Sequence, residues 1–179
     1  MAGVPTTSRI AYVPTANGDT GVVLSFMEAN SQSFVEGDLV KLDANGNIVL
    51  MDDPPGAADI CLGIALSAAT NVTSGNTYIS VQMIRPTDLF IMKLDAASTF
   101  AETDRGTYEP LDRVSAGRWV VNKAGAVTVS ALQARILGSA EYGADGTLAA
   151  TAGGPVYVRF PGTSDESQVL EFGDIAYTP

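Results

Sequence analysis

The chain of 179 residues contains no histidine, one cysteine and one tryptophan. Without histidine it lacks the commonest general base, the usual activator of a nucleophilic serine or cysteine, and the commonest zinc ligand. A single cysteine, Cys61, can form neither an intrachain disulfide nor a structural zinc site. The sequence also has no Gly-x-Ser-x-Gly, Gly-Lys phosphate-loop or Gly-x-Gly-x-x-Gly motif. We therefore expect no enzymatic activity, no cofactor and no metal site.

Paired carboxylates are the catalytic arrangement that this composition leaves open, because a glycosidase needs only two acids roughly 5–10 Å apart. Candidate pairs are Asp52 with Asp59, Asp88 with Asp95, and Asp165 with Glu166. They lie beside Gly, Pro, Ser or Thr in apparent loops, where solvated surface charge is the ordinary explanation. No ligand spacing among them singles out a calcium site.

Charged residues are scarce, at 17% of the chain, and acidic residues outnumber basic ones by 20 to 10. The resulting net charge of −10 repels phosphate backbones, so we expect no nucleic-acid partner. Seven of the ten basic residues lie between Arg85 and Arg135. This uneven distribution indicates either ordinary solvated faces or a middle segment that docks on an acidic partner.

Long hydrophobic runs are absent as well. The longest nearly apolar stretch, 60–69, is far shorter than the roughly 20 residues needed to cross a bilayer. No apolar run follows the first basic residue, Arg9, as it would in a signal peptide. We expect a protein made in the cytoplasm, without a membrane partner.

The residue types that are abundant favour short strands and tight turns. Apolar residues make up 46% of the chain, which also carries 18 glycines and 9 prolines. The segment 77–84 alternates with period 2 and places Ile79, Val81 and Met83 on one face. Further strands are expected over 22–26, 39–42, 48–50, 60–66, 89–94, 106–108, 118–121, 126–129 and 155–160. The stretch 130–139 is compatible with either a helix or a strand.

The clearest local signal is Asn45-Gly46, which lies between two apolar segments and supplies the backbone angles of a tight hairpin turn. The surrounding residues superficially resemble a calcium loop. An EF-hand loop, however, would need glycine where Ile48 stands and glutamate where Pro54 stands. The sequence therefore predicts a β-hairpin here.

These signals predict an all-β protein with a single β-sandwich or barrel-like domain of short antiparallel strands. The expected organisation is an N-terminal arm (1–33), a β domain (34–160) and a C-terminal tail (161–179). The β domain divides into two lobes of similar size, 34–95 and 104–160, with no repeat clear enough to indicate a duplication.

Several of these β segments, in this order, resemble the head decoration (cement) proteins of tailed bacteriophages. The resembling stretches are Phe34-Val35-Glu36-Gly37-Asp38-Leu39-Val40, Leu62-Gly63-Ile64-Ala65, Gly75-Asn76-Thr77-Tyr78-Ile79-Ser80-Val81, Gly106-Thr107-Tyr108-Glu109-Pro110-Leu111 and Val156-Tyr157-Val158-Arg159-Phe160. The resemblance spans about 34–160 and leaves both ends uncovered.

The resemblance implies a β-tulip-type domain and a non-enzymatic virion protein on the outer capsid surface. It implies binding to the major capsid protein, stabilisation of contacts between capsid subunits, and self-association as a homotrimer. The alternatives are another virion component, such as a tail or head-fibre protein, or a secreted adhesion or carbohydrate-binding β module.

Both ends of the chain combine turn-forming residues with spaced hydrophobes. Such residues are costly when exposed and become favourable when buried on a partner, so we expect both ends to be extended arms that contact neighbouring subunits. The alternative is that they complete the chain's own sheet. The predicted interface residues are Arg9, Ile10, Tyr12, Val13, Leu170, Phe172 and Tyr177.

Overall fold

A computed structural model describes most of the chain between residues 9 and 160. The described residues are 9–14, 21–53, 55, 59–71, 73, 77–125, 132–141 and 151–160. Within them the only helical element is the 3-10 turn η1 (Glu102–Asp104). No helix in these ranges has the length and apolar character to span a membrane.

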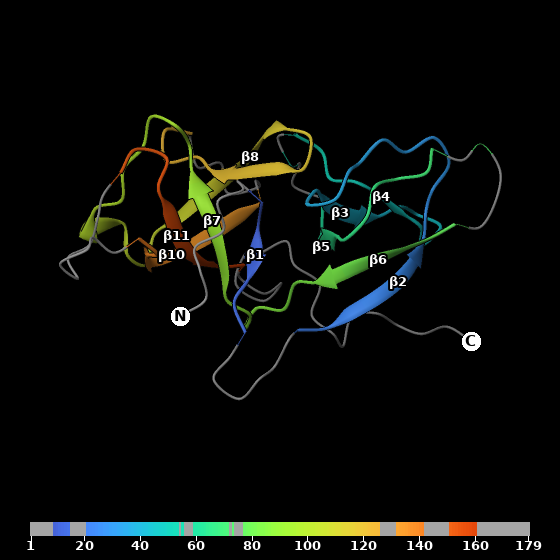
Figure 1. The fold of residues 1–179 in the computed structure, drawn as a ribbon, viewed down its shortest axis with the longest axis horizontal. Coiled ribbons are helices and arrows are strands. Elements are labelled where there is room, and N and C mark those ends of the chain that lie inside the picture. Colours follow the sequence, from blue (N-terminus) through green and yellow to red (C-terminus); the bar gives the residue numbers. More distant parts are fainter. Residues whose placement is uncertain are drawn as a thin grey trace.

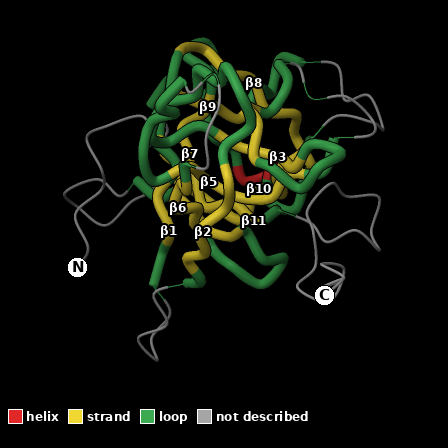
Figure 2. Tube along the Cα trace, turned by 90° about the vertical axis from the view of Figure 1, so that its right-hand side faces the viewer, coloured by secondary structure: helices red, strands yellow, loops and turns green. Residues whose placement is uncertain are grey.

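The described residues form eleven strands. Figure 1 shows them in two groups, and in the turned view of Figure 2 they lie toward the middle with loops around them. The strands are β1 (Ala11–Tyr12), β2 (Val23–Met27), β3 (Leu39–Leu42), β4 (Ile48–Leu50), β5 (Cys61–Ala65), β6 (Tyr78–Met83), β7 (Phe90–Leu94), β8 (Tyr108–Ser115), β9 (Arg118–Val121), β10 (Gln133–Ser139) and β11 (Pro155–Arg159). The predicted all-β fold is thus confirmed.

Five of these strands close into a barrel in the order β7-β11-β10-β8-β9. Its neighbours are antiparallel except at the closing seam, where β9 runs parallel to β7 and pairs Val120 with Lys93 and Val121 with Leu94. Closure removes the open sheet edges that would otherwise leave backbone groups unpaired. β1 pairs antiparallel with the start of β7, on the same edge of β7 that pairs with β9 further along the strand.

The remaining strands form a second sheet in the order β2-β6-β5-β3-β4. An isolated parallel bridge between Glu28 and Ile48 brings the end of β2 back to β4. In Figure 1 this sheet lies to the right of the barrel. Its β3–β4 hairpin carries Asn45-Gly46 in the turn, which confirms the sequence prediction.

The two halves share one topology. In chain order, β2 to β6 and β7 to β11 are each arranged as first-fifth-fourth-second-third strand, with a parallel contact between the first and third. Equivalent glycines, Gly37 and Gly106, have φ angles of 94° and 90°. Each donates its amide to the equivalent strand, at Ala65 and Ile136 respectively. The described chain is therefore built from two copies of one five-stranded unit.

The two units share part of their hydrophobic core. One cluster fills the barrel around Trp119, Phe90 and Phe160, and it also includes Leu39 and Cys61 from the second sheet. The second cluster lies on the other face of that sheet. Because one cluster spans both units, burial of apolar surface holds them together.

The predicted strands agree with the structure over most of the described residues. β10 resolves the ambiguity at 130–139 in favour of a strand where the chain is described, and the expected strand at 126–129 lies outside the described residues. The division between the halves falls between β6 and β7, because β7 closes the barrel rather than completing the first lobe.

The N-terminal segment contributes strands to both sheets. β1 pairs with β7, and β2 pairs with β6 along its whole length. The described residues within 1–33 therefore follow the alternative in which this end completes the chain's own sheets. The physical reason is burial: Ile10 is only 7% exposed and Tyr12 packs against the barrel core. The C-terminal tail lies outside the described residues.

Phe90 tests the barrel core, because its ring is fully buried and contacts Tyr12 and Phe160 edge-to-face at 5.7 and 5.5 Å. Replacing Phe90 with alanine should lower the free energy of unfolding by about 3–5 kcal/mol, as expected for loss of a buried phenyl ring. Urea denaturation measures this change. The control Val114→Ala, at a side chain that is 52% exposed, should shift stability by no more than about 0.5 kcal/mol. Equal effects of the two variants would contradict the assigned core.

Candidate functional site

The described carboxylates are engaged mainly in structural bonds, and Asp38 is the clearest case. It lies at the start of β3, is completely buried, and accepts hydrogen bonds from Arg113 Nε and Nη2 at 2.7 Å each. The amide of Gly117 and the indole Nε1–H of Trp119 donate to the same carboxylate at 3.0 and 3.2 Å. The Val35 amide completes the set at 2.9 Å.

This network joins the two units, because Asp38 belongs to the second sheet and three of its partners belong to the β8–β9 hairpin of the barrel. A Cβ atom at Gly117 would approach the Glu36 carbonyl to 2.5 Å, so only glycine fits this junction. The hydrogen bond with Asp38 raises the pKa of Arg113 above its ordinary value. The Arg113 guanidinium therefore stays charged near neutral pH.

Glu28 has an equally closed environment. Its carboxylate is 2% exposed and accepts bonds from the Thr70 amide and hydroxyl and the Asn71 amide, at distances of 2.7–3.1 Å. It fixes the loop after β5 to the end of β2. With its lone pairs occupied in this way, Glu28 has no capacity left for a reacting group.

The candidate catalytic pairs are also occupied. Asp52 and Asp59 are brought together, but through Lys41, which bonds to both. Burial alone lowers the pKa of Lys41, and the hydrogen bonds with Asp52 and Asp59 outweigh it and raise the pKa. The lysine is therefore a structural cation rather than a base.

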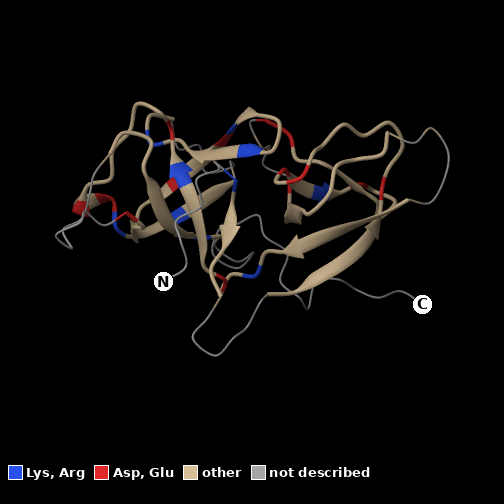
Figure 3. Ribbon diagram, viewed as in Figure 1, with Lys and Arg blue, Asp and Glu red and all other residues tan. Residues whose placement is uncertain are grey.

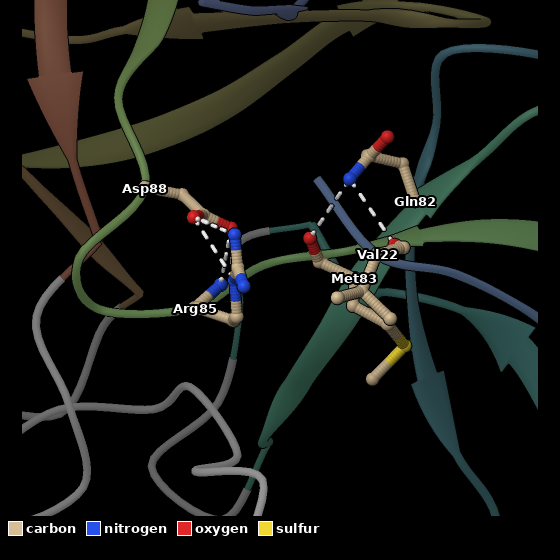
Figure 4. A network of polar contacts seen from close by, with 5 residues as sticks. All are labelled: Val22, Gln82, Met83, Arg85 and Asp88. Carbon is tan, nitrogen blue, oxygen red and sulfur yellow. Dashed lines mark hydrogen bonds and ion pairs between the residues drawn. The ribbon is translucent and has the colours of Figure 1, made fainter. Parts of the chain in front are cut away.

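The second candidate pair, Asp88 and Asp95, is not assembled into a site. Asp88 is 3% exposed and forms a two-oxygen ion pair with Arg85 (Figure 4). Asp95 holds the turn after β7 by accepting from Ala97 and Ser98. Burial opposes the charge on Asp95, but these bonds outweigh it and lower its pKa.

Metal-binding geometry is not found either: the described residues contain no group of three or more His, Cys, Asp or Glu side chains placed to hold an ion. Cys61 is fully buried, and burial raises the pKa of its thiol to about 12. It is therefore a packed apolar residue rather than a nucleophile. Asp165 and Glu166 lie outside the described residues.

The predicted N-terminal interface residues lie mainly against the chain's own barrel. Tyr12 packs on Phe90, and the Val13 amide donates to the Leu89 carbonyl at 2.8 Å. Ile10 is buried in the same cluster. Ile10, Tyr12 and the Val13 backbone therefore already make contacts within the chain.

Arg9 is the most exposed of the predicted interface residues that the structure describes. It pairs with Glu36 at 2.6 Å, and both side chains are about half exposed. Its contact with a partner stays a prediction. Leu170, Phe172 and Tyr177 lie outside the described residues.

One feature of the barrel surface has the opposite charge to the rest of the chain. A pocket of about 380 Å³ lies where β7, the β8–β9 hairpin and the segment before β11 meet. Among the described residues, its lining includes Lys93, Arg118, Ser115 and Val114, and no acidic side chain. Neither cation forms an ion pair with a carboxylate of the described residues. The pocket can therefore accept an anionic group.

Strand alternation explains why these cations face outward. Phe90, Met92 and Leu94 of β7 are buried, so Lys93 between the last two points away from the core. Arg118 begins β9 and is exposed, whereas the following Trp119 is buried. The same alternation that builds the barrel therefore exposes the basic side chains.

The excess of basic residues between 85 and 135 was the sequence signal for this pocket. Only the structure shows which of these residues are paired with carboxylates and which line the pocket. Arg85, Arg105, Arg113 and Lys123 are paired with Asp88, Glu102, Asp38 and Asp104. Arg135 lies over the ring of Tyr108, 5.7 Å from its centroid. Figure 3 shows the charged residues of the described chain on its strands and loops.

A scan against protein-family models and a search of curated protein sequences found no match to this chain.

The Asp38 network gives a direct test of how the two units are joined. Asp38→Ala should lower the free energy of unfolding by about 3–5 kcal/mol, because it leaves the Arg113 charge and the N–H donors of Val35, Gly117 and Trp119 without an acceptor. The control Glu102→Ala removes an exposed ion pair with Arg105 and should cost at most about 1 kcal/mol. Thermal and urea denaturation measure both. A loss for Asp38→Ala no greater than that of the control would show that the network is not what couples the units.

Proposed function

We propose that this protein is a non-enzymatic structural protein of a virus particle, which binds the outer surface of a tailed-phage capsid and stabilises contacts between major capsid subunits. The observation that carries the proposal is which ionisable side chains are held in internal bonds and which face outward. The carboxylates considered for catalysis are held in structural bonds where they are described, whereas the cations of the barrel pocket, Lys93 and Arg118, face outward. The resemblance over 34–160 supplies the identity of the partner.

The pocket supports binding to an acidic protein surface. A chain with a net charge of −10 repels such a surface in general, so contact requires a local cluster of cations. An exposed ion pair contributes only about 0.2–1 kcal/mol. On a lattice of identical subunits, however, many weak contacts act together through high effective concentration.

Self-association belongs to the same proposal. A homotrimer, as the resemblance implies, would present three pockets to one group of capsid subunits and would strengthen binding through multivalency. The protein would then be made in the host cytoplasm and carried on the outside of the virion. Neither nucleic acid nor membrane is part of the proposed contacts.

The proposal is tested by locating the protein on purified particles. Mass spectrometry of gradient-purified heads and tails from cells that encode this chain should find it with the heads, in many copies per particle. Immunogold labelling of intact particles should place it on the outer capsid surface. Recovery with tails alone, or absence from particles, would overturn the proposal.

The pocket is tested by charge reversal. Arg118→Glu and Lys93→Glu should each weaken binding to capsids that lack the protein by about three- to tenfold, because each replaces a weak attraction with a repulsion of similar size. The control Arg159→Glu reverses an exposed charge on β11 away from the pocket and should bind normally. Co-sedimentation measures the affinities. Equal loss in all three variants would indicate an effect of net charge rather than of the pocket.

The absence of catalysis is a separate expectation. A broad hydrolase screen, with glycosidase substrates included, should give no turnover above background. Reproducible turnover that disappears on replacing Asp52 or Asp59 with asparagine would show that the Lys41-linked pair is an active site after all.

A further inference from the structure

Among the described residues, the second sheet has an open edge at β2. The Val22 carbonyl accepts from Met83, and the Glu28 amide donates to the Thr77 carbonyl, each at 2.8 Å. Backbone groups alternate along an antiparallel ladder, so Leu24, like Val22 and Glu28, directs its amide and carbonyl toward β6. The backbone groups of Val23 and Ser25 point the other way, away from β6. Among the described residues no strand lies against this part of β2.

The barrel shows what occupies the same position in the other unit. Leu24 opposite Val81 in the β2–β6 pair corresponds to Phe90 opposite Val158 in the β7–β11 pair. The two registers stay in step along both pairs, because the Leu94 amide donates to the Gly154 carbonyl as the Glu28 amide does to Thr77.

By this correspondence Val23 and Ser25 are equivalent to Leu89 and Ile91. In the barrel those two positions are covered by β1, with Ala11 opposite Ile91 and the Val13 amide bonded to the Leu89 carbonyl. An extended antiparallel strand therefore fits this edge of the repeated unit. In the second sheet the matching place is open where the chain is described.

The open edge lacks the features that normally prevent strand pairing. β2 has the sequence Val-Leu-Ser-Phe-Met and β6 the sequence Tyr-Ile-Ser-Val-Gln-Met, with no charge, no proline and no bulge in their pairing. Figure 3 shows both strands without a charged residue. Val23 is 48% exposed and Tyr78 is 62% exposed. An apolar, neutral edge of this kind is unusual on a chain that carries ten net negative charges.

Hydrogen bonds within the chain hold the start of this edge in place without a partner. The side-chain amide of Gln82, which is 8% exposed, donates to the Val22 carbonyl at 3.2 Å and lies 3.4 Å from the Met83 carbonyl (Figure 4). Nearby, Arg85 and Asp88 clamp the link between the units. A pre-ordered edge loses little conformational entropy when a strand adds to it.

We propose that this edge of β2 binds the same edge of a second copy, as an antiparallel pair across a two-fold axis. Val23 of one copy lies opposite Ser25 of the other, and each exchanges its amide and carbonyl with its partner. The contact is isologous, so both open edges are satisfied at once and neither copy has to release β1. The outer face of β2 and β6 is neutral, which lets two strongly acidic chains approach here with the least repulsion.

A two-fold contact closes at two copies, so it is distinct from the threefold contact of the proposed trimer, which would assemble on the capsid. It depends only on the β2 edge and requires no capsid. Its failure in solution would therefore leave the proposed capsid function untouched, and failure of capsid binding would leave this contact untouched.

Ser25→Pro tests the pairing, because it removes an amide that points away from β6 and so spares the internal ladder. Analytical ultracentrifugation should find the native chain as dimers, with the dissociation constant of Ser25→Pro raised about tenfold or more. The matched control Ser25→Val keeps the amide and should dimerise like the native chain. Circular dichroism checks that each variant is folded.

Three outcomes would overturn the proposal: a native chain that is monomeric at every concentration, equal association of the two Ser25 variants, or a trimer unaffected by Ser25→Pro. The register is tested separately by mixing Val23→Cys chains with differently tagged Ser25→Cys chains. Under oxidising conditions the mixture should form a heterodisulfide faster than either variant links to itself, because these positions face each other. Buried Cys61 does not compete. No preference for the mixed product would contradict the register even if Ser25→Pro does not fold.

Discussion

The buried carboxylate of Asp38 constrains much of the rest of the structure. It lies at the junction of the two units and accepts bonds from Arg113, Gly117 and Trp119 of the β8–β9 hairpin. A buried charge of this kind is tolerated only while all its partners are in place. The start of β3 and the hairpin of the barrel are therefore held in one relative position. Within the barrel, the β7–β9 register places Arg118, which follows the turn of the same hairpin, in the pocket that Lys93 also lines.

Repetition of one five-stranded unit has produced two different surfaces. The barrel unit closes through the β7–β9 pairing, has the rest of that β7 edge covered by β1, and exposes a cation beside buried hydrophobes on each of β7 and β9. The β2–β6 unit returns to itself only through the Glu28–Ile48 bridge and keeps a neutral edge. The same backbone plan would thus serve the proposed charged contact in one half and the proposed backbone contact in the other. The two proposed contacts draw on different physical forces and can be perturbed independently.

The distribution of charge links the fold to the proposed role. Buried carboxylates such as Asp38, Glu28 and Asp88 form hydrogen bonds and ion pairs that hold loops and strands together. The other acidic residues give the surface its general negative charge. The two proposed contacts lie where that surface is basic or neutral. A protein organised in this way is suited to selective docking on other proteins, because most of its surface repels an acidic neighbour.

The sequence by itself determined the strand content, the hairpin at Asn45-Gly46 and the buried role of Cys61, because these follow from period-2 alternation, turn chemistry and local hydrophobicity. It also located the basic excess between Arg85 and Arg135. Only the tertiary structure decided which of those cations are neutralised, since Asp38 and Arg113 are 75 residues apart in the chain. The duplication was equally hidden. Equivalent positions such as Ser25 and Ile91 share a backbone register but not a side chain, because backbone hydrogen bonding constrains the register while each unit packs its own neighbours.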